Sequence, residues 1–393
     1  MDFRFTPEQE ALRAELREFL RHELPPDWQV RNDREELSPE EFAFSQHFAR
    51  KLGERGWLTM AWPKEYGGRN ATQIEQTIFA EEMAYAGAPL GFGFGTQLVG
   101  PTLMVWGTEE QKRRFLPPIA RAEVFWCQGF SEPGAGSDLA SLQTRAERHG
   151  DDYIINGQKI WTSEGQYADW MILLARTDPN APKHRGISYF LVDMKSPGIT
   201  LTPLINLMGT HAFNQVYFDN VRVPVANRVG EENRGWYVAT TTLDFERTGI
   251  ARVIWALRQF EELVELVHER AARGEAWARR LSLRYKLAEL RIEFEIARLL
   301  CYRVAWLQTK GAIPNYESSM AKMFGSELNQ RFGATAINVL GLTGQLEPGS
   351  RWAPLQGRIE RTYMAGVSYT IAGGTSEIQR NIIAQRGLGL PRG

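Results

Sequence analysis

The sequence is poor in cysteine. Its 393 residues include only two, Cys127 and Cys301, which excludes the small disulfide-rich scaffolds of secreted proteins. The six histidines are scattered, and no cysteine and histidine combination has the spacing of a zinc site. We therefore predict no metal site, and a reducing, cytoplasmic compartment is the simpler interpretation.

The chain also lacks a large excess of charge of either sign. Lysine and arginine number 46 against 47 for aspartate and glutamate, which gives a formal net charge of −1. Proteins that hold nucleic acid by bulk electrostatics carry a basic excess, so we expect no nucleic-acid partner. An anionic ligand would have to be bound by a local group of residues.

Long hydrophobic runs are absent as well. A membrane-spanning helix needs roughly 18 or more consecutive apolar residues, and no segment offers them without charges. The first residues, MDFRFTPEQEALRAELREFL, carry acidic groups early, unlike a secretory signal or a transit peptide. We therefore expect no integral membrane segment. The hydrophobic fraction of 43% is that of an ordinary globular chain.

What the sequence does contain is three regions of different texture. Residues 1–123 have the three- and four-residue apolar spacing of helices, residues 124–233 have short β-type runs between turn signals, and residues 234–393 are helical again. We predict an α+β multidomain protein with these three domains. The first is α-helical, the middle one is an antiparallel β-barrel or sandwich, and the last is a four-helix bundle.

Local signals refine this organisation. Ser38 before Pro39 is a good helix N-cap with proline in the first turn. Asn156-Gly157 is a hairpin signal in the middle domain. In the last domain the periodicity predicts long helical segments near 236–272, 276–309, 315–341 and 354–388.

Three motifs stand out, and each has a plain structural interpretation. FSEPGAGSDL, from Phe130 to Leu139, is a turn whose glycines let the backbone bend and approach a ligand closely. Its GAGSD lacks the G-x-G-x-x-G spacing of a Rossmann fold. NGQKIWTS ends at Ser163, and its tryptophan could simply be a core residue. GTSEIQRNIIA reads as a helix start with Thr375 or Ser376 as N-cap.

Taken together, in this order and across nearly the whole chain, the three motifs resemble the acyl-CoA dehydrogenase family. The resemblance implies an FAD-dependent enzyme that takes a proton and a hydride from an acyl-CoA thioester. It also implies that the electrons pass to an electron-transferring flavoprotein. A homo-oligomer built as a dimer of dimers, or a mixed tetramer, is expected.

The resemblance also implies which residues contact the flavin. The segment around Gln128, Phe130 and Ser131 would supply backbone and hydroxyl contacts, and Ser137 would lie near the CoA arm. Further along, the family pattern implies that Trp161 lies against the flavin ring and Ser163 at its N5 edge, with Thr162 as a further cofactor contact. It also implies that Thr375 and Glu377 meet the flavin or its adenosine-linked chain. Where many members have R-x-T-F-G, this chain has ERAARG, so Arg270 is only a candidate for the contact usually made there.

The general base is the open question. The family signature I-Y-E-G-T carries it as glutamate, but in IAGGTSEIQR the corresponding positions are Ala372 and Gly373, which cannot accept a proton. A helical stripe offers an alternative, because Glu246 is the only polar residue among positions 243, 246, 250, 253, 257, 260, 264 and 267. A carboxylate on such a stripe tends to have the raised pKa that a base needs. Pairing with Arg247, or a stripe that leaves the core before 246, are the structural alternatives.

The resemblance favours Glu246. Isovaleryl- and long-chain-acting members carry their base in a sequence like L-D-x-E-R, which matches Leu243-Asp244-Phe245-Glu246-Arg247 here. Asp244, Arg247 and Ala372 then become substrate-side candidates. Gly373 keeps the backbone N–H that would bind the thioester carbonyl oxygen.

The small residues Ala372 and Gly373 leave volume for a branched, long or ring-bearing acyl group. Two other functions stay open from the sequence. One is an O2-using flavoenzyme of the same fold, an acyl-CoA oxidase or a monooxygenase. The other is a catalytically inactive subunit of a mixed oligomer.

Overall fold

The computed structural model describes residues 4–26, 28, 36–89, 92–245 and 249–391. Contacts within the chain divide it into two compact units. The first, which we call the helical unit, consists of Met1–Asp33, Thr72–Ala88 and Arg247–Gly393. The second, the sheet unit, consists of Arg34–Ala71 and Pro89–Glu246. Helices from both ends of the chain therefore share one unit.

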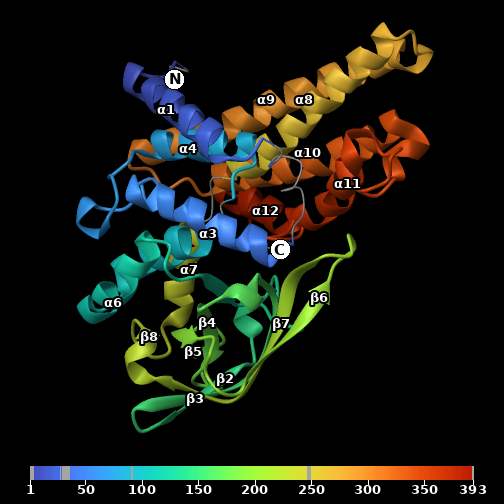
Figure 1. The fold of residues 1–393 in the computed structure, drawn as a ribbon. Helices are drawn as coiled ribbons and strands as arrows, with labels where there is room; N and C mark the ends of the chain where they lie inside the picture. The colour runs from blue at the N-terminus through green and yellow to red at the C-terminus, as the bar shows by residue number, and fades with distance from the viewer. Residues whose placement is uncertain (1–3, 27, 29–35, 90–91, 246–248, 392–393) are drawn as a thin grey trace. The chain divides into compact units, whose positions relative to one another are not determined.

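The helical unit is built of α-helices (Figure 1). Thr6 caps the first of them with its side chain and forms a reciprocal capping box with Gln9, which satisfies backbone N–H groups that a helix start leaves free. Its α-helices are α1 (Pro7–Glu23), α4 (Gln73–Ala86), α8 (Ile250–Ala272), α9 (Leu281–Thr309), α10 (Tyr316–Leu340), α11 (Arg358–Tyr369) and α12 (Ser376–Ile382).

Three aromatic rings form the centre of this unit. Phe260 of α8, Phe294 of α9 and Phe332 of α10 are buried. Their ring centroids lie 5.3, 5.7 and 6.1 Å apart. Each buried phenylalanine contributes roughly 1.5 to 3 kcal/mol relative to an exposed one. The three long helices thus share one core, and the expected C-terminal helical domain is confirmed.

A buried ionic cluster joins the N-terminal helices to this bundle. Arg13 of α1 contacts Glu82 of α4 at 2.5 Å, and Arg298 of α9 contacts Glu81 of α4 at 2.5 Å. The hydroxyl of Tyr302 donates to the Glu81 carboxylate. Burial alone would raise the pKa of Glu81, but Arg298, Tyr302 and Arg13 hold it below its usual value. Because one partner alone would be an uncompensated buried charge, the cluster fixes α1 and α4 against α9.

The sheet unit combines one mixed sheet with helices (Figure 1). Its strand order is β6-β7-β3-β2-β4-β5-β8, and β1 pairs with β4 outside this path. The strands are β1 (Trp126–Gly129), β2 (Arg145–His149), β3 (Asp152–Ser163), β4 (Trp170–Arg176), β5 (Ile187–Asp193), β6 (Ile199–Ile205), β7 (His211–Pro224) and β8 (Arg228–Val229). The α-helices are α3 (Pro39–Glu54), α5 (Gly100–Trp106), α6 (Glu109–Ala120) and α7 (Gly235–Phe245).

The expected middle β-domain is present, with two differences from the expected antiparallel barrel. The pairs β1–β4 and β2–β4 are parallel. Among the strands that the structure describes, β6 and β8 are the two ends of the order, so the sheet does not close into a barrel. Parallel neighbours require the chain to return between them, and here it does so through β3 between β2 and β4, and through β2 and β3 between β1 and β4. Local turn signals do not report such crossovers.

The hairpin expected at Asn156-Gly157 is wrong. Both residues lie inside β3, where the pairing with β7 shifts register between Ile155 and Gly157. Gly157 has φ 145°, and a Cβ there would lie 2.7 Å from the Cα of Thr144 on the approach to β2. The extra residue of this shift is on β7, because Ile155 and Gly157 pair with Val221 and Phe218. The glycine at 157 instead serves the close approach of two backbones, another common reason for glycine in a strand.

The single helix expected over 236–272 is also wrong. α7 ends at Phe245 and α8 begins at Ile250, with Gly249 as N-cap at φ 56°. A left-handed residue cannot continue a right-handed helix, and glycine adopts this conformation at little cost. The apolar stripe divides accordingly: Leu243 packs against the core of the sheet unit, whereas Ile250 and Phe260 belong to the core of the helical unit. Ser38, by contrast, caps α3 as expected.

Candidate active site

Glu132 organises the loop that carries the first motif. Its backbone exchanges two hydrogen bonds with Ala135, each 3.0 Å long. Its carboxylate accepts the backbone N–H of Gln143 at 2.6 Å and that of Thr144 at 2.9 Å. One side chain therefore joins the start of this loop to its end. We call residues 130–144 the motif loop.

Lys159 of β3 completes the arrangement. Its ammonium lies 2.7 Å from the Glu132 carboxylate and donates to the carbonyl oxygen of Phe130 at 3.0 Å. The Lys159 side chain is 0% exposed and that of Glu132 is 7% exposed. Burial lowers the pKa of Lys159 in spite of Glu132, while Lys159, Thr144 and Gln143 hold the pKa of Glu132 below its usual value against burial. The sequence analysis did not predict this pair, although Glu132 belongs to the first motif and Lys159 to the second.

The end of β3 turns a tryptophan away from the core. Pairing with β7 shifts between Lys159 and Thr162, so one extra residue is inserted there. Trp161 lies in this bulge with φ 61°, is 59% exposed, and meets Phe213 edge-on at 5.9 Å. Positive φ is unusual for a bulky residue and bulges often reorient a side chain beside a site. The alternative of a core tryptophan is excluded.

Two polar side-chain atoms on β1 and β3 are buried without a hydrogen-bond partner among the described residues. They are Nε2 of Gln128 on β1 and Oγ1 of Thr162 on β3, and neither makes a hydrogen bond within the described residues. An unsatisfied buried polar group costs about 1 to 3 kcal/mol. A ligand with hydrogen-bonding atoms would remove that cost, and both residues are among the predicted flavin contacts.

The other predicted residues of this region differ in exposure. The Phe130 ring is buried and packs on Tyr189 at 6.0 Å, which leaves only its backbone for a ligand. Ser131 and Ser163 are half-buried, and Ser137 is exposed on the motif loop. The carbonyl oxygen of Ser131 accepts the N–H of Ile160 at 2.9 Å. Within the sheet unit, the structure thus brings the first and second motifs side by side.

The third motif lies in the helical unit, at the turn between α11 and α12. Thr375 caps α12 by accepting the N–H of Ile378 at 3.2 Å, so the expected N-cap is Thr375 and not Ser376. Lys322 of α10 donates to the carbonyl oxygen of Gly374 at 2.6 Å and holds the turn. Glu377 is exposed, and its pKa is lowered by its own backbone N–H and by Thr375.

Gly373 occupies a left-handed position in this turn, with φ 65°. A Cβ there would meet no atom within 4 Å, and Ala372 beside it is exposed. Within the described residues the N–H of Gly373 has no hydrogen-bond acceptor. The position can therefore offer a backbone donor in open space.

The remaining candidates are placed less favourably or fall at undescribed positions. Arg270 is in the last turn of α8 and pairs with Glu275 at 3.0 Å. Glu246 and Arg247 lie outside the described residues. Asp244 belongs to α7, the helix that leads to them.

The helix that leads to Glu246 is firmly held. Thr242 shares a hydrogen bond with Thr102 of α5 at 2.8 Å, and Thr241 accepts from the indole nitrogen of Trp106 at 3.0 Å. Thr242 is completely buried. Buried hydroxyl pairs of this kind fix the rotation of a helix as well as its position.

Glu164 is a further ionisable residue that sequence reasoning missed. It directly follows Ser163 and has a left-handed backbone, φ 51°. Burial raises the pKa of Glu164 from its ordinary 4.5 to about 7. The available signal was an acidic residue immediately after NGQKIWTS.

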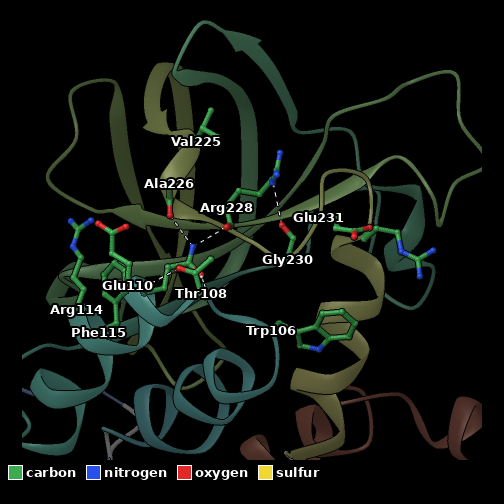
Figure 2. Close-up of a pocket in the computed structure, with 12 residues that line it drawn as sticks. Trp106, Thr108, Glu110, Arg114, Phe115, Val225, Ala226, Arg228, Gly230 and Glu231 are labelled. Carbon is green, nitrogen blue, oxygen red and sulfur yellow. Dashed lines mark hydrogen bonds between the residues drawn. The ribbon is translucent and has the colours of Figure 1, made fainter.

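A pocket elsewhere in the sheet unit does not contain these residues. Figure 2 shows it, with a volume of about 570 Å³, between the start of α6 and the segment that follows β7. Gln111 closes one wall by donating to the carbonyl oxygens of Ala226 and Arg228, both at 2.8 Å. The pocket lining includes none of the predicted site residues.

Among the described residues, no helix is both long and apolar enough to cross a membrane. Within the same residues, no three His, Cys, Asp or Glu side chains gather as a metal site would require.

Comparisons with known proteins agree along the whole chain. Family models match as the acyl-CoA dehydrogenase N-terminal domain over residues 6–123, the middle domain over 127–221 and the C-terminal domain over 233–388. Acyl-CoA dehydrogenase FadE26 of Mycobacterium tuberculosis is 40% identical over 100% of this chain and 99% of its own length.

Two solved structures are similar over their entire length. The Tcur3481-Tcur3483 steroid ACAD matches with a TM-score of 0.90 and 37% identity, covering 100% of both chains. The ChsE4-ChsE5 complex from Mycobacterium tuberculosis matches with a TM-score of 0.89 and 39% identity, also covering 100% of both chains. The chain belongs to the acyl-CoA dehydrogenase family and is an enzyme of that class.

Proposed function

We propose that this chain binds FAD and catalyses α,β-dehydrogenation of an acyl-CoA thioester. The observation that carries the proposal is a pair of buried atoms, on Gln128 and Thr162, that have no hydrogen-bond partner among the described residues, together with the outward-facing Trp161 next to Thr162. The polar atoms offer hydrogen bonds and the exposed indole offers a flat surface, as a flavin ring requires. When bound, FAD accepts the hydride from the β-carbon.

The chain's own residues provide the rest of the chemistry. Glu246 is the proposed general base that takes the α-proton, since Ala372 and Gly373 cannot. The N–H of Gly373 is the proposed donor to the thioester carbonyl oxygen, where negative charge develops as the proton leaves. A glycine at position 373 lacks the side chain that the family signature has there but keeps this backbone donor. Ser131, Ser163, Thr375 and Glu377 remain proposed cofactor contacts, with Arg270 as a candidate, and Ser137, Asp244, Arg247 and Ala372 remain proposed substrate contacts.

The proposed substrate class is a branched, long or ring-bearing acyl-CoA. Ala372 and Gly373 are both exposed and small, and a Cβ at position 373 would meet open space. One of the two similar solved structures is a steroid ACAD, which supports a bulky acyl group here by analogy.

A second subunit is the proposed partner of helix α9. Six large apolar residues, separated by three, four or seven positions, are between 37% and 67% exposed along this helix. Such spacing places them on one face, and exposed apolar stripes of this kind usually mark protein interfaces. The similar ChsE4-ChsE5 structure is a complex. This supports a related chain as the proposed occupant of this face, and a second copy of this chain is the alternative. The residues are Leu281, Tyr285, Ile292, Ile296, Leu299 and Trp306.

The electrons would pass to an electron-transferring flavoprotein. The domains would divide at 123 and 233 as the sequence predicts.

Glu164 also fits the proposed hydride transfer. Below about pH 7 its carboxyl is mostly neutral and adds little negative charge beside Ser163, whereas an ionised carboxylate there would oppose the arrival of a hydride.

Glu246→Gln tests the proposed base. Removing a general base should lower the rate of flavin reduction by acyl-CoA roughly 10²- to 10⁴-fold, with FAD and substrate binding retained. Anaerobic stopped-flow absorbance measures that rate. Glu265→Gln, an exposed change on α8, is the matched control. Near-wild-type reduction by Glu246→Gln would refute the assignment and direct attention to Asp244 or Glu377.

Substrate preference tests the proposed volume at positions 372 and 373. We expect kcat/KM for isovaleryl-, palmitoyl- or ring-bearing acyl-CoA to exceed that for butyryl-CoA by about 10-fold or more, since a few methylenes in a fitting pocket are worth that much. Ala372→Leu should reduce the advantage by filling the space. A strict preference for short straight chains contradicts the substrate class.

Glu164→Gln tests the raised pKa. Because the folded pKa is above the ordinary 4.5, the unfolded chain releases this proton first. The wild-type protein should therefore lose stability as pH rises through about 7, by at most about 1.4 kcal/mol per pH unit. Urea denaturation at pH 5 and pH 8 measures this effect: the free energy of unfolding of Glu164→Gln, relative to wild type, should be higher at pH 8 than at pH 5. The control Glu265→Gln should show no such change. An equal difference at both pH values would show that Glu164 is ionised throughout.

A further inference from the structure

Two chain segments proposed to contact the flavin come from separate parts of the sequence. One runs from Gln128 to Ser131 at the end of β1, and the other from Trp161 to Ser163 at the end of β3. No strand pairing between β1 and β3 fixes their separation, because β1 pairs with β4 and β3 pairs with β2 and β7. Their relative position must depend on other contacts.

Three hydrogen bonds connect residues 130–132, at the end of the first segment, with residues 159 and 160, directly before the second. The N–H of Ile160 donates to the carbonyl oxygen of Ser131 at 2.9 Å. The ammonium of Lys159 donates to the carbonyl oxygen of Phe130 at 3.0 Å and to the Glu132 carboxylate at 2.7 Å. Two of the three come from one side chain, which is fully buried.

The Glu132 carboxylate carries the constraint further along the motif loop. Besides Lys159 it accepts the N–H groups of Gln143 and Thr144. Its two oxygens thus receive three donors, and the ion is well compensated in its buried position. Removing either charge would leave the other uncompensated, a change that disrupts buried pairs strongly.

Neither group can take part in proton transfer with a ligand. Lys159 is 0% exposed, and its ammonium is directed to Phe130 and Glu132. Glu132 is only 7% exposed and fully engaged. A role in the reaction can therefore act only through the position of neighbouring backbone.

We propose that the buried Lys159–Glu132 pair is a positioning device that sets the separation of the segments Gln128–Ser131 and Trp161–Ser163 before FAD binds. The inference rests on the proposed function, since the ligand it prepares for is the flavin. The pair makes the motif loop rigid in the empty protein, so FAD does not have to order that loop on binding.

A double-mutant cycle tests the proposal through FAD affinity. Glu132→Gln and Lys159→Met should each raise the Kd for FAD about 10-fold or more, the equivalent of losing one good hydrogen bond. The double variant should resemble a single variant, because the two side chains act as one unit. Fluorescence titration with FAD, at a temperature where each apoprotein is folded by circular dichroism, gives the Kd values.

Tyr153→Phe is the matched control. Tyr153 lies on the same strand, is 0% exposed, and bonds Glu232 and Arg228 at 2.7 Å through its hydroxyl. It should lower stability without changing FAD affinity. If Glu132→Gln and Lys159→Met behave in the same way, with lower stability and a Kd within about 2-fold of wild type, the pair is merely structural and the proposal fails.

A measurement on the unaltered protein covers the case in which the variants do not fold. Hydrogen exchange should find the N–H groups of Gln143 and Thr144 protected in the FAD-free protein. Exchange that is fast until FAD is added would show that the flavin orders the motif loop, which overturns the proposal. Failure of the wild-type chain to bind FAD at all would instead overturn the proposed function.

Discussion

The ion pair between Lys159 and Glu132 is the interaction on which the arrangement of the first two motifs within the sheet unit depends. It connects a motif on a loop with a motif on a strand, and it lies where water cannot compete for either charge. The neighbouring bulge in β3 then turns Trp161 outward, while Gln128 and Thr162 keep polar atoms without partners. Backbone held by several hydrogen bonds, with unsatisfied polar groups nearby, is what a preorganised binding site requires.

The elements that sequence patterns predicted well are those set by local contacts. Helices α9 and α10 and the caps at Ser38 and Thr375 follow from periodicity and capping chemistry, whereas the helical segment expected near 354–388 is divided into α11 and α12. Other failures involve residues whose local signal has two meanings. Asn156-Gly157 signals a hairpin or a close backbone approach within a strand, and Gly249 can lie within a helix or end one; only the packing around each decides.

The site shows the same division. The motifs could be recognised from sequence, but the Lys159–Glu132 contact could not, since it joins residues 27 apart and depends on how the strands cross. The pKa of Glu164 likewise follows from burial, which no local pattern reports. Glu246 remains a prediction from the L-D-x-E-R match. The glycine at 373 is consistent with that assignment, since it retains an N–H donor while lacking a side chain that could compete as base.

Anaerobic titration of the FAD-loaded chain with acyl-CoA thioesters is the most direct test of the central claim, that this chain is a working flavin-dependent dehydrogenase. The account predicts stoichiometric loss of the oxidised flavin's visible absorbance with at least one bulky acyl-CoA, together with formation of the α,β-unsaturated thioester. A chain that binds both FAD and acyl-CoA but leaves the flavin oxidised with every thioester tested would contradict it.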